Sequence, residues 1–250
     1  MKLAGKTDVG SVRPENQDDY RAGELNSDAA WGLVCDGMGG ANAGNVASRF
    51  AAQSFIESAG DALSGTLDET ARQNLLTQAL KRANETVFSL AGRQPEVRGM
   101  GTTLVAALIQ GDCATVINVG DSRAYRFDGE AMHQISEDHS YVEEMVAMGQ
   151  MERDSSAYNR QKNIITRAMG ISETVDTDFF EVDLEPGDYF LLCSDGLTNM
   201  VEDRDICRIV SGPGTMREKA SALIAEANRR GGNDNIAVVL VKPLESGVTT

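Results

Sequence analysis

The chain has 250 residues, a length typical of one large domain, and carries 38 acidic against 23 basic residues, a formal net charge of −15. Such a charge repels nucleic acid and anionic membranes, so the sequence argues against both as partners. Four cysteines without a C-x-x-C pair and only two histidines argue against a zinc site. The chain starts without an apolar signal segment and contains no run long enough to span a membrane, which predicts a cytoplasmic protein.

The first half of the chain predicts strands interrupted by two helices. Apolar residues recur at helical spacing over residues 43–58 and 68–90. Short apolar runs lie on both sides of these helices, and the pairs Gly111-Asp112 and Asp128-Gly129 predict tight hairpin turns among the later runs. The expected strands are 19–23, 29–35, 102–109, 114–119, 122–127 and 131–135.

The second half opens with a polar, weakly patterned stretch over residues 139–169 and then returns to strands at 174–182 and 189–193. Pro186 and Gly187 occupy positions typical of a β-turn between these two strands. A helix over 216–230 is followed by a last buried strand at 236–241. Strands in hairpin blocks, with helices inserted early and late, favour an α+β fold in which helices cover a β-sandwich.

Five aspartates stand beside the apolar strands. Gathered at one edge of a sheet, their carboxylates would repel one another and lose hydration. Hard divalent cations such as Mg²⁺ or Mn²⁺ relieve both penalties. A single Asp-Gly pair more often marks an ordinary turn, but several such aspartates beside strands predict a metal site. The five are Asp18, Asp36, Asp121, Asp195 and Asp234.

Eight short motifs follow one another in order along residues 2–243. They are T-D-V-G with R-P-E-N-Q-D, V-C-D-G-M-G-G, G-T-T, N-V-G-D-S-R, E-D-H-S, I-T-R-A-M-G, C-S-D-G-L-T-N and G-N-D-N. In this order they resemble the metal-dependent Ser/Thr protein phosphatases of type 2C, in their compact bacterial form. The resemblance implies one catalytic domain over residues 1–250. It also implies a central antiparallel β-sandwich of two sheets, helices on both outer faces, and a mobile flap at about residues 140–170.

The same resemblance implies a two-metal centre that binds Mn²⁺ or Mg²⁺. Asp36 is expected to bridge the two ions, and the carbonyl of Gly37 joins it at one of them. Asp195 and Asp234 are expected to complete the other position. Asp18 is expected to act through metal-bound water.

A third, weaker metal ion is implied at Asp121 and Asp195. Asn199, where some relatives carry an aspartate, predicts weaker binding there. Met38 stands where many eukaryotic relatives have a histidine that is proposed to protonate the leaving alkoxide. We therefore hypothesise that water on the third ion is the acid, which requires that Asp121→Ala slow alkyl esters more than aryl esters. His139 is an alternative acid, but we expect it to anchor the flap.

Charge arithmetic makes such a centre suitable for a phosphate ester. Three metal-binding carboxylates and two divalent ions leave about one positive charge, and Arg13 adds another, against a phosphomonoester that carries up to two negative charges. A guanidinium can bind two phosphate oxygens at once, although Arg13 could instead form a surface ion pair. Two metals about 3.5–4 Å apart can lower the pKa of a bridging water toward about 7, and the hydroxide then attacks phosphorus in line.

The sequence therefore predicts a protein phosphatase that hydrolyses phosphoserine and phosphothreonine and reverses a bacterial Ser/Thr kinase. One alternative is a catalytically silent relative that regulates a partner, and another is a two-metal nuclease or hydrolase of small phosphoesters. The expected partners are phosphorylated proteins, such as a Ser/Thr kinase, a forkhead-associated protein or a secretion-system regulator. Neither nucleic acid nor a membrane is expected as a partner, and the chain is expected to be a monomer.

Overall fold

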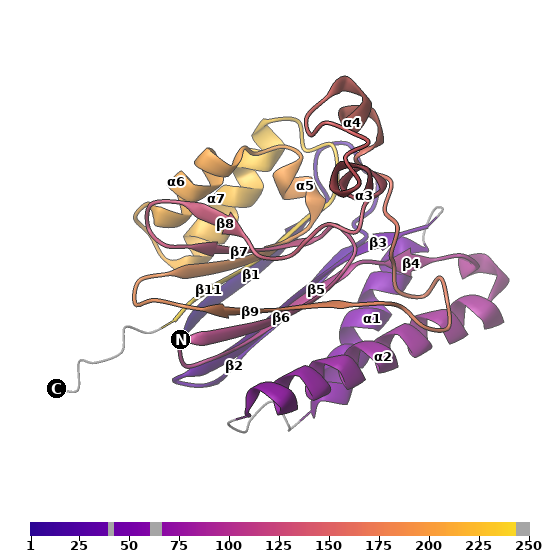
Figure 1. Cartoon of the computed structure of the whole chain (residues 1–250), viewed down its shortest axis with the longest axis horizontal. Coiled ribbons are helices and arrows are strands. Elements are labelled where there is room, and N and C mark those ends of the chain that lie inside the picture. The colour runs from indigo at the N-terminus through magenta and orange to yellow at the C-terminus, as the bar shows by residue number, and fades with distance from the viewer. Residues whose placement is uncertain (40–42, 61–66, 244–250) are drawn as a thin grey trace.

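Two antiparallel sheets stack face to face in the computed structural model, which describes residues 1–39, 43–60 and 67–243 (Figure 1). The first sheet has the order β1 (Lys2–Asp8), β11 (Ile236–Lys242), β10 (Tyr189–Cys193), β7 (Arg123–Phe127) and β8 (Met132–Gln134). The second has the order β2 (Asp18–Asn26), β3 (Ala29–Met38), β5 (Leu104–Gln110), β6 (Cys113–Val119) and β9 (Asp178–Asp183). The short strand β4 (Gly101–Thr102) pairs with the end of β3.

Helices cover the outer face of each sheet, as the sequence predicts (Figure 1). The second sheet is covered by α1 (Gly44–Ala59) and α2 (Glu69–Arg93), which the 3-10 helix η2 (Pro95–Val97) follows. The first sheet is covered by α6 (Asp203–Ser211) and α7 (Met216–Arg229), with the short α5 (Asp195–Thr198) directly after β10. Two further short helices, α3 (Tyr141–Ala147) and α4 (Ser156–Gln161), lie at one end of the sandwich. No helix within the described residues is long and apolar enough to cross a membrane.

Successive side chains of the central strands alternate between the helix-covered face of each sheet and the space between the sheets, so the core of the described residues has three layers. In β11, Val238 and Leu240 pack toward the helices of the first sheet, whereas Ala237 and Val239 pack between the sheets. In β3, Leu33 and Cys35 face α1 and α2, and Val34 lies between the sheets. Because successive side chains of a strand point to opposite faces, Asp36 falls on the same side as Val34. The strand pattern therefore directs the Asp36 carboxylate into the end of the space between the two sheets.

The long helices predicted from sequence are confirmed to within a few residues, and the starts of α2 and α7 are capped by side chains. Asp68 accepts a hydrogen bond from the Ala71 amide at 2.8 Å before α2. Thr215 and Glu218 form a reciprocal capping box before α7. The strand predicted at 174–182 begins later, at Asp178, because residues 170–173 form a turn that is hydrogen-bonded to α2.

Several elements were not predicted from sequence. Strand β1 is a partly exposed edge strand with lysines and a central glycine, so it lacks apolar alternation. Helices α3 and α4 lie inside the stretch that looked weakly patterned and depend on the serine caps Ser140 and Ser155. Helix α6 has only three buried residues. These elements contribute few residues to the core, and they leave a correspondingly weak signal.

Candidate active site

Asp18 and Asp36 lie directly opposite each other on β2 and β3. The Asp36 backbone is fixed by Thr102 of β4 and by Thr103, the next residue. Thr103 Oγ1 accepts a hydrogen bond from the Asp36 amide at 3.0 Å, and the Thr103 amide donates to the Asp36 carbonyl at 2.9 Å. Thr102 Oγ1 donates to the same carbonyl at 2.9 Å. Like charges placed opposite each other on neighbouring strands destabilise a sheet. The fold therefore holds two carboxylates in an unfavourable arrangement.

The first sheet brings two more aspartates to the same end of the sandwich. Asp195 begins α5 directly after β10, and Asp234 lies two residues before β11. Ser194 Oγ donates to Asp18 Oδ2 at 2.6 Å, which joins the two sheets beside the carboxylates. Asn235 makes a second connection, because its Oδ1 accepts from the amide of Gln17 at 2.8 Å. Neither Ser194 nor Asn235 was singled out from the sequence, although both stand inside the motifs.

Burial and mutual repulsion raise the pKa values of these carboxyl groups. Burial, followed by the charges of Asp195 and Asp234, raises the pKa of Asp18 to about 8 against the stabilising hydrogen bond from Ser194. Burial and then the Asp18 and Asp195 charges raise the pKa of Asp36 well above its ordinary value. The pKa of Asp195 is raised by burial and by Asp234. These groups need positive charge close by before they can ionise together near neutral pH.

Two buried oxygens show where such a charge would act. Asp18 Oδ1 and Asp195 Oδ1 have no hydrogen-bond partner among the described residues. Unpaired carboxylate oxygens are the ligands that Mg²⁺ and Mn²⁺ prefer, so the donor set fits the metals that the sequence predicts. Among the described residues, no three acidic, His or Cys side chains lie close enough together to bind one metal ion in this structure.

Arg13 contributes to the separation of the carboxylates because it holds Asp234. Its Nη2 donates to Asp234 Oδ2 at 2.7 Å, and the Asp234 carboxylate raises the pKa of the guanidinium. The ion pair turns Asp234 toward Arg13. The surface ion pair that the sequence left open for Arg13 is therefore present in this structure.

Gly37 lies where β3 meets the start of α1. A Cβ on Gly37 would lie 2.1 Å from the Gly44 carbonyl oxygen, a separation that no side chain tolerates. The Gly37 amide donates to the Gln17 carbonyl at 3.1 Å, and the Gly37 carbonyl oxygen would meet a Cβ on Gly44 at 2.6 Å. The two glycines allow the helix start and the strand end to approach closely beside Asp36.

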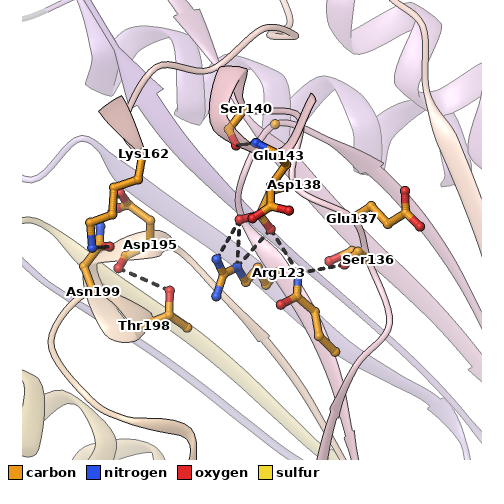
Figure 2. A network of polar contacts seen from close by, with 12 residues as sticks. Arg123, Ser136, Glu137, Asp138, Ser140, Glu143, Lys162, Asp195, Thr198 and Asn199 are labelled. Carbon is orange, nitrogen blue, oxygen red and sulfur yellow. Dashed lines mark hydrogen bonds and ion pairs between the residues drawn. The ribbon is translucent and has the colours of Figure 1, made fainter. Parts of the chain in front are cut away.

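A cavity of about 180 Å³ separates Asp121 and Asp195 from the segment that carries α4. Lys162 donates to Asn199 Oδ1 at 2.6 Å, and Asn199 Nδ2 donates to Asp195 Oδ2 at 2.8 Å (Figure 2). A cationic side chain from this segment is thereby linked to a predicted metal ligand through one amide. Burial and then the charge of Asp195 raise the pKa of Asp121 to about 7.

His139 is buried at the base of the same segment. Its Nδ1 accepts from the Gly120 amide at 3.0 Å, and its Nε2 lies 3.0 Å from Asp178 Oδ2 and 3.1 Å from Arg167 Nη1. Both ring nitrogens therefore have protein partners, which favours the anchoring role expected for His139 over a role as acid. Arg123, which the sequence did not single out, forms a bidentate ion pair with Asp138, the residue before His139 (Figure 2).

Aspartates at one end of two helix-covered sheets, two of them with unpartnered buried oxygens, and an arginine beside them suit a metal-dependent hydrolase. The family model for protein phosphatase 2C matches residues 11–240. The serine/threonine phosphatase Stp of Listeria innocua is 37% identical, with 97% of this chain and 96% of that protein covered. The protein phosphatase PhpP of Streptococcus pneumoniae is also 37% identical, with 96% of this chain and 97% of that protein covered.

Solved structures agree with these relatives. The serine/threonine phosphatase of S. agalactiae superposes with a TM-score of 0.86 at 35% identity, over 96% of this chain and 98% of that one. The phosphatase PstP/Ppp of Mycobacterium tuberculosis has a TM-score of 0.82 at 32% identity, over 97% and 98% of the two chains. The chain belongs to the protein phosphatase 2C family. It is a metal-dependent serine/threonine phosphoprotein phosphatase with the α+β sandwich of that family.

Proposed function

We propose that the carboxylates between the sheets hold two Mn²⁺ or Mg²⁺ ions and that Arg13 binds the phosphate of the substrate. The observation that carries this proposal is the pair of unpartnered buried oxygens on Asp18 and Asp195. When bound, the ions supply positive charge for the phosphate and activate water for in-line attack on phosphorus. The proposed metal-binding groups are Asp18, Asp36, the Gly37 carbonyl, Asp195 and Asp234.

Arg13 is well placed to change partners. Its side chain is 53% exposed, and its only ion pair with a described residue is the one to Asp234. A dianionic phosphate offers two oxygens to the guanidinium and competes with a single carboxylate for it. Transfer of Arg13 to phosphate would release Asp234 toward the metal, so substrate and metal binding would support each other.

Arg13→Ala is expected to lower kcat/KM for a phosphothreonine peptide by about 10- to 100-fold, and Arg13→Lys is expected to recover only part of the loss because an ammonium cannot bind two oxygens in a fixed fork. Phosphate release at saturating Mn²⁺ measures both variants. Arg204→Ala removes another exposed arginine that is ion-paired at 2.8 Å, to Glu202, and serves as the control. Equal losses in Arg13→Ala and Arg204→Ala would contradict a role in phosphate binding.

We propose a third, weaker cation site at Asp121 and Asp195. Lys162 and Asn199 are expected to weaken cation binding there. The ammonium of Lys162 adds positive charge to the cavity, and Asn199 occupies Asp195 Oδ2 as a donor. Both features lower the affinity of this cavity for a further cation.

Asn199→Asp is expected to tighten the weakest Mn²⁺ site by about tenfold, which corresponds to about 1.4 kcal/mol, because it replaces a donor by a carboxylate. Titration calorimetry with Mn²⁺ measures the change. Asn163→Asp adds the same charge to the same cavity without contacting Asp195 and is the matched control. The same affinity gain in both variants would assign the effect to charge alone and not to the bond at Asp195.

The physiological substrates are proposed to be proteins phosphorylated by a bacterial Ser/Thr kinase, including the kinase itself, forkhead-associated proteins or secretion-system regulators. One bacterial relative named a serine/threonine phosphatase and another named a protein phosphatase support this class of substrate. We further propose that residues 1–250 act as one catalytic domain, as a monomer in the cytoplasm, with residues 140–170 as its mobile flap.

Manganese-dependent hydrolysis of p-nitrophenyl phosphate and a phosphothreonine peptide tests the proposed function. We expect both substrates to be hydrolysed when Mn²⁺ is present and neither after chelation. No hydrolysis of either substrate in added Mn²⁺ would indicate a silent regulatory relative. Activity on nucleotides without activity on phosphopeptides would indicate a hydrolase of small phosphoesters.

A further inference from the structure

A groove of about 310 Å³ opens beside Met38, two residues beyond Asp36 on β3. Its other apolar lining residues come from the segment before β9, namely Ile165, Ala168, Ile171 and Val175. Ile171 is 51% exposed, and none of the five apolar lining residues is fully buried. An aliphatic surface therefore adjoins the candidate active site.

Buried main chain behind the groove connects its two sides. Met38 pairs with Gly101 of β4, and Thr102 exchanges backbone hydrogen bonds of 3.1 and 2.9 Å with Met169. A Cβ on Gly101 would lie only 2.9 Å from Ile171 Cδ1, so Ile171 lies against the bare glycine. The glycine thus lets the Ile171 side chain pack close to β4, on the same side of the groove as Met38.

Buried Asn84 of α2 fixes the wall that carries Ile171. Its Nδ2 donates to the carbonyls of Ser172 and Glu173 at 3.1 and 3.0 Å, and its Oδ1 accepts from the Gly170 amide at 2.8 Å. Asn84 thereby holds the turn at residues 170–173 with three hydrogen bonds. A preformed wall binds a ligand without the cost of ordering a loop.

Within the described chain, the groove lining carries one unpaired carboxylate. Arg167, the basic residue of the lining, is ion-paired to Asp178 at 3.1 Å. Asp176 lines the groove and forms no hydrogen bond or ion pair with any described residue. The neighbouring carboxylate of Glu173 is likewise unpaired within the described part of the chain. An aliphatic lining with one unpaired carboxylate favours a peptide that carries an aliphatic and a basic side chain.

We propose that this groove binds the part of the substrate protein next to the phosphorylated residue, with an aliphatic side chain between Met38 and Ile171 and a lysine or arginine beside Asp176. The inference rests on the proposed function and defines its substrate class. An extended peptide advances about 3.3 Å per residue, as does β3 between Asp36 and Met38. The aliphatic residue is therefore expected two or three positions from the phosphorylated one.

Matched phosphothreonine peptides test this inference. They carry isoleucine or asparagine two or three positions from the phosphothreonine, on either side, and lysine or glutamate next to that residue. Wild-type protein with Mn²⁺ is expected to show a kcat/KM about tenfold higher for the best isoleucine–lysine peptide than for its asparagine–glutamate counterpart. Ile171→Asn is expected to remove the preference for isoleucine, and Asp176→Asn the preference for lysine.

Two controls separate recognition from loss of structure. Ile164→Asn changes an isoleucine that is 50% exposed but lies outside the groove lining, and it should leave peptide selectivity unchanged. Hydrolysis of p-nitrophenyl phosphate, which has no flanking peptide, should be the same in all three variants. Val175→Thr keeps the branched shape of the side chain but replaces a methyl group by a hydroxyl group, and it should weaken the isoleucine preference even if Ile171→Asn folds poorly.

Three results would overturn the inference. The first is equal behaviour of Ile171→Asn and Ile164→Asn toward the peptides. The second is a parallel loss on p-nitrophenyl phosphate and on peptides in both Ile171→Asn and Val175→Thr. The third is a changed sedimentation coefficient with unchanged selectivity, which would make the groove a contact between copies of the chain. Hydrolysis of p-nitrophenyl phosphate with no phosphopeptide hydrolysed by wild type would contradict the proposed function itself.

Discussion

Asp36→Asn is expected to lower kcat/KM at least about 10³-fold and, at the same time, to stabilise the metal-free protein. The activity loss follows if Asp36 bridges the two ions, because about 4 kcal/mol of transition-state stabilisation corresponds to this factor. The gain in stability follows from the position of Asp36, opposite Asp18 on the neighbouring strand and with a pKa raised by burial and nearby carboxylates. Asparagine keeps the shape of the side chain and removes the charge.

Thermal unfolding with and without Mn²⁺ separates these two effects. Wild type is expected to gain stability from Mn²⁺, whereas Asp36→Asn should start from a higher Tm without metal and gain little. Asp28→Asn, an exposed change in the same β2–β3 hairpin, should resemble wild type in both conditions. A metal-free Asp36→Asn protein that melts below wild type would show that the carboxylate contributes a favourable interaction of its own.

The metal-free protein is expected to lose stability as the pH rises from about 4 to about 8. Asp18 has a pKa of about 8 when folded and an ordinary value of 3.8, so over this range the folded state binds more protons than the unfolded state. Stability then falls with rising pH. We expect the free energy of unfolding to fall by about 2–4 kcal/mol, or Tm by about 5–10 °C. The loss is smaller than the full pKa shift of Asp18 implies because the neighbouring carboxylates share the cost of ionisation.

Melting curves between pH 5 and pH 8 in the presence of a chelator measure this loss. Asp18→Asn should flatten the dependence, since it removes the group with the raised pKa. Saturating Mn²⁺ should raise Tm more at pH 8 than at pH 5, because metal binding requires ionised carboxylates. A metal-free Tm that rises from pH 5 to pH 8, in wild type and Asp18→Asn alike, would contradict the proposed origin of the effect.

The sequence predicts the framework of the site better than its contacts. Asp36 and Asp195 were found because each directly follows an apolar strand, and the alternation of that strand determines where the side chain points. The bond from Ser194 to Asp18, the pairing of Arg13 with Asp234 and the link from Lys162 to Asn199 were not predicted. Each joins residues far apart in the chain, and strand periodicity carries no information about such pairs.

The start of β9 illustrates the same limit. Residues 174–177 have the composition of a strand, but the turn that Asn84 holds delays pairing until Asp178. The signal for this turn lies in α2, about 90 residues earlier in the chain. Local propensity was overridden by one tertiary contact.

The two pairs of aspartates belong to sheets that share no strand pairing: Asp18 and Asp36 extend from one, and Asp195 and Asp234 from the other. Their relative position is therefore set by apolar packing between the sheets, by residues such as Val34 and Val239, together with the hydrogen bonds of Ser194 and Asn235 that join the sheets. A slip of a fraction of an ångström in that layer would leave every strand and helix intact and invisible to circular dichroism. It would nevertheless change the spacing of the carboxylates, so metal affinity is a finer gauge of native core packing here than secondary-structure content.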